Sequence, residues 1–289
     1  MLHVIHQDIS ASFSAAELSK IAAYSEQHFH RVFKQIVGES MNVYIRRTRL
    51  EHAANQLMFD SNTRVLDIAQ KCGFSSLSSF THAFKRAFRV TPAQWRSTAR
   101  QHKEPPYLGD IEIAEAYKRI HGLPVAEPKL IRIKPVHVAY VRHKGYGRSI
   151  RKAWQILESW CVAHQTKFGG LFSDDISLCG QQIALHHSNP EWVELDDCHY
   201  VACVTIDQRI LRRGIVNSLT IPGGLHAVFD LTGKYGELLP LIGNILSNWL
   251  PSSGYVLQTT PMLVHYRKNH LIDSDETFDV QLHLPIATI

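Results

Sequence analysis

Hydrogen-bonding side chains are regularly spaced in the segment EQHFHRVFKQIV, which follows Ser25. In a helix, Glu26, Gln27, His30 and Arg31 lie at spacings of one, three and four and share one face near the helix start. In the DNA major groove, a guanidinium group can donate two hydrogen bonds to guanine, and a carboxamide can pair similarly with adenine. The spacing indicates a helix whose exposed face contacts base edges. Arg31 is the strongest candidate, with a phosphate contact as its alternative role.

A second segment of the same layout, LSSFTHAFKRAF, follows Ser76. Its corresponding face offers Leu77, Ser78 and His82 as candidate base contacts, although these groups distinguish bases less well; Leu77 could contact a thymine methyl group. We therefore expect base discrimination mainly in the first segment and phosphate contacts in the second. The predicted phosphate contacts are Ser25, Arg46, Arg47, Ser76, Ser79, Lys85 and Arg86.

Short helices must position these two faces. Apolar residues recur three and four positions apart as far as Arg96, and Pro92 is the one proline in that stretch, which predicts an all-helical segment. Ser25 has the residue type and position of an N-cap, and Gly38 is expected to end the helix that follows. A long helix is predicted over residues 41–59.

The two helix pairs repeat each other. Leu18, Ser19, Ala23 and Tyr24 correspond to Ile68, Ala69, Gly73 and Phe74, and Ser25, Phe29, Phe33 and Lys34 correspond to Ser76, Phe80, Phe84 and Lys85. Each copy is predicted to be a short helix, a tight turn, a serine cap and a second helix, the layout of a helix-turn-helix. Two rigidly joined units about 34 Å apart could enter successive major grooves, so a monomer would suffice. The predicted core aromatic residues are Phe33, Phe74, Phe80, Phe84 and Trp95.

The positive charge is concentrated in this helical segment. Residues 1–103 hold 14 Lys and Arg against 7 Asp and Glu, a net of +7, whereas residues 104–289 hold 17 against 19, a net of −2. Neutralising phosphates supplies most non-specific affinity for nucleic acid, so this split favours a DNA-binding segment joined to a domain with another task. A solvated basic face is the alternative interpretation of the charge alone.

Composition excludes several other classes. With 45% hydrophobic and 20% charged residues the chain is globular in type. No stretch approaches the roughly 20 apolar residues of a membrane helix and the N-terminus lacks the layout of a signal peptide, so we expect a cytoplasmic protein without a membrane partner. Five scattered cysteines and 18 histidines lack metal-ligand spacing, so neither a metal nor a cofactor is predicted.

The rest of the chain predicts a different architecture. Four prolines around one helix, residues 110–121, mark residues 101–128 as a linker. Beyond it, β-type runs are interrupted by two helical runs, over residues 150–164 and 235–249. The order strand, helix, strand, strand occurs twice and predicts an antiparallel sheet carrying two helices, an α+β domain over residues 129–289 whose halves frame one cleft. The expected strands are residues 137–143, 199–206, 226–232, 261–267 and 278–286.

Residues 1–96 resemble the DNA-binding domain of AraC/XylS-type transcription regulators, in the branch with MarA-like and Rob-like members. The resemblance rests on Tyr24-Ser25, Arg31, Phe33-Lys34, Gly38, Tyr44, Arg49-Leu50, Ala53, Ile68-Ala69, Gly73-Phe74, Phe80, Phe84-Lys85, Thr91-Pro92 and Trp95-Arg96. It implies base contacts at Gln27, His30 and Arg31. Ala23 stands where the family usually has the turn glycine, so the turn is expected to be modestly strained if it needs a positive φ.

Residues from about 128 to 289 resemble the GyrI-like effector-binding domain, which implies a pocket for small, often cationic molecules. The resemblance rests on Gly145, Trp154, Trp160, Gly224, Gly233, Tyr235, Pro261, Tyr266 and Leu284-Pro285-Ile286. Val264 occupies the family's usual glutamate position, and Gln281 another commonly acidic one. Without a buried carboxylate a desolvated cation is poorly compensated, so we expect a neutral or anionic ligand. The predicted pocket residues are Tyr235, Val264, Tyr266, Gln281 and Trp154, of which the aromatic ones have plain core packing as their alternative role.

Three hypotheses follow from these patterns. The first is a sequence-specific transcription regulator, an activator rather than an enzyme, which binds double-stranded DNA through residues 1–100 and contacts RNA polymerase. In it the C-terminal domain senses a small molecule or contacts a partner. The second adds hydrolysis of small molecules by the GyrI-like domain, but no catalytic residue is predicted because Val264 and Gln281 replace the obvious acids. The third is an architectural DNA-binding protein whose C-terminal core is filled.

Overall fold

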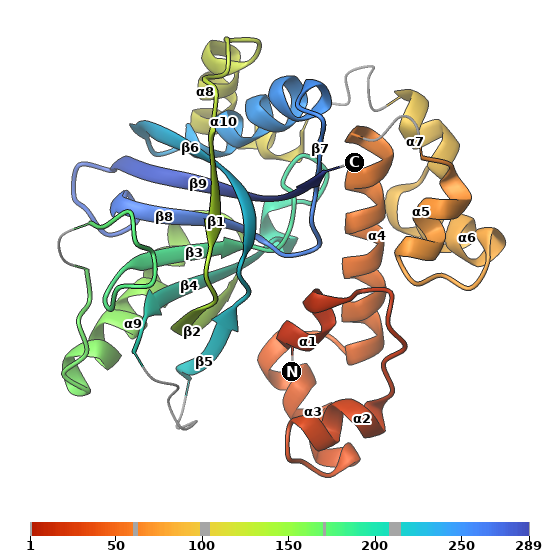
Figure 1. The fold of residues 1–289 in the computed structure, drawn as a ribbon, viewed down its shortest axis with the longest axis horizontal. Helices are drawn as coiled ribbons and strands as arrows, with labels where there is room; N and C mark the ends of the chain where they lie inside the picture. Colours follow the sequence, from red (N-terminus) through yellow and green to blue (C-terminus); the bar gives the residue numbers. More distant parts are fainter. Residues whose placement is uncertain (1, 60–62, 99–104, 170–171, 208–214, 289) are drawn as a thin grey trace. The chain divides into compact units, whose positions relative to one another are not determined.

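A computed structural model describes residues 2–59, 63–98, 105–169, 172–207 and 215–288. The chain divides into two compact units, residues 1–103 and 104–289 (Figure 1). The first unit coincides with the basic segment of the sequence. Within the described ranges, every helix is too short or too polar to cross a lipid bilayer.

The N-terminal unit is helical throughout its regular structure. The long helix α4 joins the pair α2 and α3 to the pair α5 and α6 (Figure 1). The predicted long helix over residues 41–59 and the tandem helix pairs are confirmed. The helices are α1 (Leu2–Gln7), α2 (Ala15–Ile21), α3 (Glu26–Val37), α4 (Met41–Phe59), α5 (Val65–Lys71), α6 (Leu77–Phe88) and α7 (Pro92–Thr98).

The turns inside the two helix pairs have the same backbone geometry. Ala23 and Gly73 both adopt left-handed conformations, with φ of 55° and 76°. In each turn this residue donates its amide hydrogen to the carbonyl three residues earlier, and the next amide donates to the carbonyl five residues before it, at 2.8 to 3.0 Å. The turn therefore does need a positive φ, and Ala23 adopts it at a cost of about 1 kcal/mol relative to an unstrained residue.

Aromatic rings form the core beneath both pairs. The rings of Phe84 and Trp95 meet edge to face with centroids 5.7 Å apart, and the Trp95 indole donates a hydrogen bond to the Ala54 carbonyl of α4 at 3.2 Å. Ile5 of the short helix α1 is also fully buried. The core prediction is confirmed for Phe33, Phe80, Phe84 and Trp95, all at most 5% exposed, whereas Phe74 is half-buried.

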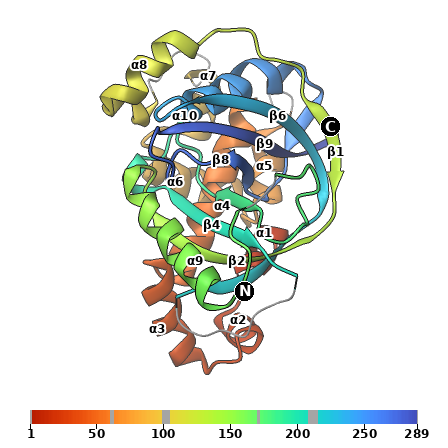
Figure 2. The same ribbon diagram turned by 90° about the vertical axis from the view of Figure 1, so that its left-hand side faces the viewer.

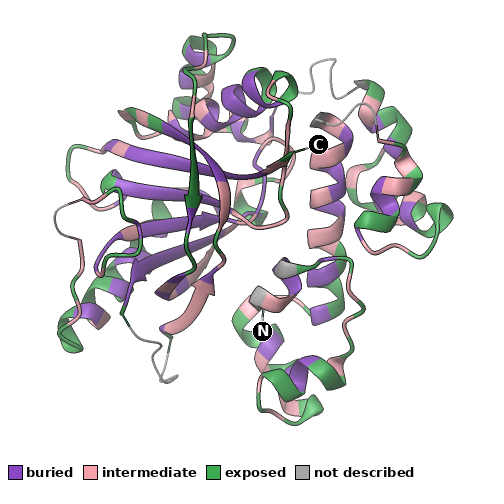
Figure 3. Ribbon diagram, viewed as in Figure 1, coloured by how far each residue is buried: buried purple, intermediate pink, exposed green. Residues whose placement is uncertain are grey.

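The C-terminal unit is built on one antiparallel sheet of nine described strands, in the order β1-β6-β9-β8-β3-β4-β2-β5 with β7 beside β9. Figure 2 shows that the sheet is strongly curved. Its central strands are largely buried, whereas β1 is exposed along most of its length (Figure 3). The strands are β1 (Lys129–Ile133), β2 (Val136–Lys144), β3 (Gln182–His186), β4 (His199–Thr205), β5 (Asn217–Ile221), β6 (Gly224–Lys234), β7 (Tyr255–Leu257), β8 (Met262–Lys268) and β9 (Thr277–Thr288).

The sheet order confirms the predicted duplication. The first repeat is β2, a helix, β3 and β4, and the second is β6, a helix, β8 and β9. Their strands run β6-β9-β8 and β3-β4-β2 across the sheet, so the two repeats meet where β8 pairs with β3. The predicted α+β class is therefore confirmed.

Helices from both repeats pack on the sheet. In the first repeat α9 (Arg151–Ala163) packs on β2 and β4, after the single turn η2 (Arg148–Ile150). In the second repeat α10 (Leu238–Asn244) packs on β6 and continues as a π-helical turn, η4 (Ile245–Trp249), and then η5 (Leu250–Ser252). The helical run expected over residues 235–249 is thus divided rather than a single α-helix.

Part of the segment expected as a linker packs into the C-terminal unit. Tyr107, in the turn η1 (Pro106–Gly109), is fully buried and donates a hydrogen bond of 2.7 Å to the Glu191 carboxylate. Asp110 then caps α8 (Ile111–Ile120), which packs on α10. Residues 105–120 therefore belong structurally to the domain that follows, because Tyr107, Ile113 and Ile120 are buried there.

Candidate nucleic-acid interface and small-molecule pocket

Helix α3 presents a polar face above a buried aromatic one. The Ser25 hydroxyl accepts a hydrogen bond from the His28 amide at 3.4 Å, and Gly38 ends the helix with φ of 86°. Phe29 and Phe33 are 2% and 3% exposed, since they face the core of the unit. The predicted base contacts Gln27, His30 and Arg31 are all exposed.

One of these side chains is already oriented by a neighbour. The Arg31 guanidinium lies 3.0 Å from Nδ1 of His28, and the His28 ring in turn contacts the edge of Tyr24, with centroids 4.7 Å apart. Holding a long side chain in place reduces the conformational entropy that it loses on binding. Arg31 is therefore partly preorganised at the surface of α3.

Helix α6 is capped and packed in the same way as α3, but its exposed side chains distinguish bases less well. Leu77, Ser78 and His82 are exposed, as are Lys85 and Arg86. Ser76 caps the helix by accepting a hydrogen bond from the Ser79 amide at 3.1 Å, and the Ser79 hydroxyl donates to the Ser76 carbonyl at 2.9 Å. Both hydroxyl groups are thus engaged within the cap.

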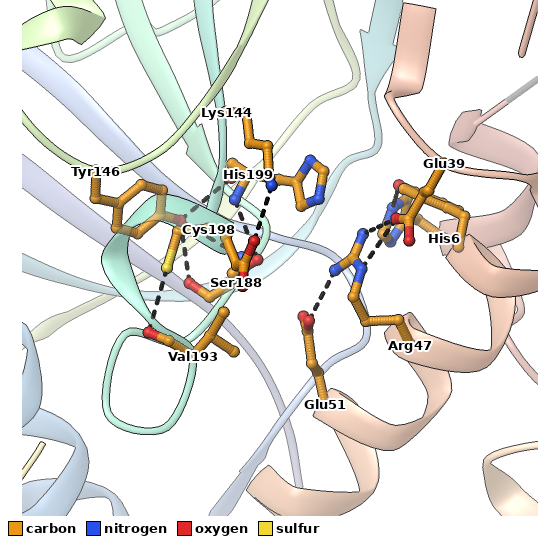
Figure 4. Close-up of polar contacts among 12 residues, drawn as sticks. His6, Glu39, Arg47, Glu51, Lys144, Tyr146, Ser188, Val193, Cys198 and His199 are labelled. Atoms are coloured by element: carbon orange, nitrogen blue, oxygen red, sulfur yellow. Dashed lines mark hydrogen bonds and ion pairs between the residues drawn. The ribbon is translucent and has the colours of Figure 1, made fainter. Parts of the chain in front are cut away.

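The three arginines of α4 have different roles. Arg46 is exposed beside a hollow of about 280 Å³. Arg47 instead forms ion pairs with Glu39 and Glu51, each at 2.7 Å (Figure 4), so its guanidinium is engaged inside the unit rather than free for the predicted phosphate contact. Its position follows from the i, i+4 spacing with Glu51, which sequence inspection did not take into account.

Arg49 connects three separate segments. Its guanidinium donates hydrogen bonds to the carbonyls of Ile9 at 2.7 Å, Ala11 at 2.7 Å and Gly73 at 2.9 Å. A Cβ atom on Gly73 would lie 2.7 Å from the guanidinium carbon, so a larger residue in this turn would have to displace the end of the Arg49 side chain. Arg49 thereby fixes the second helix-turn-helix against the segment that precedes the first.

In the C-terminal unit, a cavity of about 50 Å³ lies where the two repeats meet. Strands of both repeats line it, together with η2 and helices α8 and α10, so one cavity is framed by both halves as predicted. The lining residues are Ile113, Tyr146, Gly147, Ile150, His186, Tyr200, Tyr235, Gly236, Leu238, Leu239, Tyr266, His270 and Leu271.

The polar groups of the cavity include two buried imidazoles. His186 is 5% exposed and neither of its ring nitrogens has a hydrogen-bond partner; Nδ1 of His270 also lacks one. Burial lowers the pKa of His186 to about 3 and that of His270 to about 4, so both rings are neutral near neutral pH. Unmet buried hydrogen-bonding groups are costly and are candidates for a ligand contact.

The tyrosines of the cavity are held by other contacts. The Tyr146 hydroxyl donates to the Ser188 carbonyl at 3.0 Å (Figure 4). The Tyr200 and Tyr266 hydroxyls are 3.3 Å apart, and the Trp154 indole donates to Tyr200 at 3.1 Å. Trp154, predicted for the pocket, is fully buried and supports these two rings without lining the cavity, which fits its alternative role as a core aromatic.

The ring of Tyr235 forms a cation–π contact with an arginine of the protein itself. The Arg148 guanidinium lies 3.8 Å from the centre of the Tyr235 ring. Arg148 also pairs with Glu112 at 3.0 Å and Glu276 at 2.8 Å, so its charge is balanced by two carboxylates. The aromatic face that the sequence offered for a ligand cation is therefore occupied by the protein's own arginine.

Two predicted pocket residues lie elsewhere. Val264 is fully buried opposite Ala184 and Leu282, outside the lining of the cavity. Gln281 pairs with His265 in the sheet register, and opposed residues share a face, so its side chain lies on the face opposite that of Tyr266. Grouping Gln281 with Val264 and Tyr266 was thus wrong, because the register between β8 and β9 could not be read from the sequence.

The face of the sheet that carries Gln281 also holds a cluster of buried histidines. His226 and His265 flank His283, with ring centroids 5.9 and 6.3 Å from it. Burial lowers the pKa of all three rings, to about 4, 4 and 3. Among the described residues, no group of three His, Cys, Asp or Glu side chains is arranged to hold a metal ion.

Sequence inspection missed His186, Tyr200 and His270. His186 ends β3, whose short run QIALH was not recognised as a strand. Had it been, the alternation of strand side chains would have placed Gln182, Ala184 and His186 on one face. Tyr200 lay within a predicted strand, but its contact with Tyr266 joins residues that are 66 positions apart in the sequence.

Comparison with known proteins identifies two domains. Residues 18–98 match a helix-turn-helix domain, and residues 126–287, more than half of the chain, match a GyrI-like small molecule binding domain. Both resemblances inferred from the sequence are confirmed.

Curated relatives match over part of the chain. A probable transcriptional regulator, LumQ of Photobacterium leiognathi, is 36% identical over 32% of this chain and 37% of its own length. PqrA of Proteus vulgaris, a probable transcription factor, is 41% identical over 26% of this chain and 61% of its length. MarA of Salmonella typhimurium, a multiple antibiotic resistance protein, is 32% identical over 37% of this chain and 84% of its length. The match with LumQ spans little more than a third of that protein.

Proposed function

Because this chain belongs to the family with GyrI-like small molecule binding domains and carries a helix-turn-helix domain ahead of that domain, we propose that it is a transcription regulator that binds specific double-stranded DNA. The proposal is carried by the two capped helices α3 and α6, each with an exposed polar face over a buried aromatic core. The C-terminal unit senses a small molecule, and the regulator activates transcription in the cytoplasm through contact with RNA polymerase.

The two recognition helices divide the work of binding. Helix α3 supplies base discrimination through Gln27, His30 and Arg31, whose amide, imidazole and guanidinium groups suit base edges. Helix α6 contributes mainly phosphate contacts through Lys85 and Arg86, because its short side chains distinguish bases less well. The remaining proposed contacts are Leu77, Ser78 and His82 with bases and Ser25, Arg46, Ser76 and Ser79 with phosphates. For Ser76 and Ser79 the hydroxyl must exchange the hydrogen bond that it donates within the cap for one to phosphate.

Arg31→Ala and Arg86→Ala test this division as a matched pair, since both remove an exposed arginine from a recognition helix. An operator is first selected from a random duplex pool with the unmodified protein. Arg31→Ala is expected to raise the Kd for that operator at least about tenfold and to leave the Kd for random duplex nearly unchanged. Arg86→Ala is expected to weaken both duplexes alike and to reduce the salt slope by about one.

Two outcomes would contradict the proposal. Equal losses on operator and random duplex for Arg31→Ala would show that Arg31 contacts phosphate only. Failure of the unmodified protein to retard any duplex at low salt would refute DNA binding itself.

Binding without turnover is the activity we propose for the C-terminal pocket. The described lining contains two histidines and four tyrosines but no carboxylate, so the acidic residue expected of a hydrolase of this fold is absent from it. A compound that binds the pocket should be recovered unchanged after prolonged incubation with the protein. Its conversion would favour the hydrolase hypothesis instead.

A further inference from the structure

Building on the proposed function, we propose that the pocket at the junction of the two repeats takes a small, uncharged, single-ring aromatic molecule bearing a hydroxyl group, that is, a phenol. This assignment names the ligand class of the sensing domain and differs from recognition of an organic cation. It rests on the hydrogen-bonding groups, the charge and the size of the cavity.

The hydrogen-bonding capacity of the cavity is unmet at His186. A neutral imidazole has one donor and one acceptor nitrogen, and both nitrogens of His186 are buried without a partner. A phenolic hydroxyl can donate to the acceptor nitrogen, or accept from the donor, in the same way that the hydroxyls of Tyr200 and Tyr266 pair with each other. A ligand hydroxyl at His186 would remove the penalty of leaving that ring unsatisfied.

The charge of the lining favours an uncharged ligand. None of the described lining residues is permanently charged, and His186 and His270 are too deeply buried to be cationic near neutral pH. The charges beside Tyr235 are Arg148, Glu112, Glu276 and Asp110. Arg148 pairs with both glutamates, and the Asp110 carboxylate accepts two backbone hydrogen bonds at the start of α8. A buried cation or carboxylate would therefore lose its hydration without gaining a free counter-ion.

The surfaces of the cavity favour an aromatic ring, and its size excludes more than one. Tyr146, Tyr200 and Tyr266 present ring edges and faces, and Ile113, Leu238 and Leu239 supply aliphatic contacts. The volume of about 50 Å³ is smaller than the roughly 150 Å³ of a cavity that holds benzene. A single ring is thus the largest group that we assign, and it requires the lining side chains to move outward.

Four single-ring probes test the assignment on the full-length protein by isothermal titration calorimetry. They are phenol, toluene, benzoate and benzyltrimethylammonium. Phenol should bind with a Kd at least about tenfold below those of benzoate and benzyltrimethylammonium, because each ion must be desolvated. His186→Phe should raise the phenol Kd at least about tenfold and leave the toluene Kd within about threefold, since only the hydroxyl contact is removed.

His226→Phe is the matched control. It also removes a buried imidazole with an unpartnered Nδ1, but on strand β6 outside the pocket lining, so it should leave the ranking of the probes unchanged. The ranking for the unmodified protein tests the proposal even if His186→Phe fails to fold.

Three results would overturn the assignment. Tighter binding of benzyltrimethylammonium or benzoate than of phenol would refute an uncharged ligand while leaving small-molecule sensing intact. Absence of binding by phenol at millimolar concentration would refute the phenol class, whereas DNA binding is judged separately by the Arg31 and Arg86 variants. An equal loss of phenol affinity in His226→Phe would show that the effect of His186→Phe does not come from a contact between His186 and the hydroxyl.

Discussion

Mild acid should destabilise the C-terminal unit far more than a typical domain. Five of its histidines are at most 6% exposed, and burial lowers the pKa of each to about 3 or 4, against about 6.5 in an unfolded chain. The unfolded state therefore binds more protons below about pH 6.5, and stability falls as the pH decreases from there toward the folded-state pKa values. These histidines are His186, His226, His265, His270 and His283.

The size of this effect follows from the linkage between proton binding and folding. When the pH falls from about 7 to about 5.5, each of these histidines binds most of one proton in the unfolded state but almost none in the folded state. This difference lowers the unfolding free energy by about 1 kcal/mol per residue. Five residues together remove about 5 kcal/mol, comparable with the whole stability of many domains. Buried Glu191 works in the opposite direction, since burial raises its pKa, but one carboxylate offsets only a fraction of this loss.

Urea unfolding of the full-length protein, followed by tryptophan fluorescence at about pH 7 and about pH 5.5, measures the difference. Replacing His265 and His283 together by glutamine should reduce the pH difference by about 2 kcal/mol, because two of the five protons are removed. His82→Gln is the control, since this side chain is exposed on α6. Unfolding free energies that agree within about 1 kcal/mol at the two pH values would refute the reasoning, because the buried rings would then titrate as in the unfolded chain.

Two further predictions concern the N-terminal unit. Arg49→Ala should lower the unfolding free energy of the N-terminal unit by about 3 kcal/mol, because three hydrogen bonds from a half-buried guanidinium to carbonyls are lost. If urea unfolding shows a loss below about 1 kcal/mol, water fully replaces these hydrogen bonds. Gly73→Ala should lower the unfolding free energy by about 2 kcal/mol, because the positive φ strains alanine and the added Cβ atom contacts Arg49. Ala23→Gly should instead leave the unfolding free energy unchanged or raise it by up to about 1 kcal/mol. Thermal unfolding of the two turn variants side by side checks this contrast, and equal losses would contradict it.

The N-terminal unit could be predicted closely because its signals are local. Ser25 and Ser76 are caps, Gly38 is a helix end, and the buried Phe residues recur at helical spacing, all within a few residues of the features that they determine. The engagement of Arg47 by Glu39 was missed because that contact joins a side chain of α4 to a residue outside it. Charge and residue type alone did not distinguish an exposed arginine from a paired one.

The C-terminal pocket was less accessible to sequence reasoning because its contacts are long-range. Tyr235 and Tyr266 were identified through a family resemblance and do line the cavity. His186 was not identified as a pocket residue, because its place in the lining depends on the pairing of β3 with β8, some eighty residues away. No local pattern in the sequence determines the register of that pairing. The absence of a carboxylate from the described lining is consistent with the expectation drawn from Val264, although Val264 itself lies outside the cavity.

Helix α8 lines the pocket and lies near the N-terminal end of the C-terminal unit in the sequence. It contributes Ile113 to the pocket lining, packs on α10, and is held to η2 by the exposed ion pair between Glu112 and Arg148. It is also the first α-helix after the N-terminal unit ends at Lys103. Unlike the strands beneath the cavity, α8 has no sheet hydrogen bonds to resist displacement. Displacement of α8 by a guest molecule that widens the cavity would give the proposed sensing a short covalent route to the N-terminal unit.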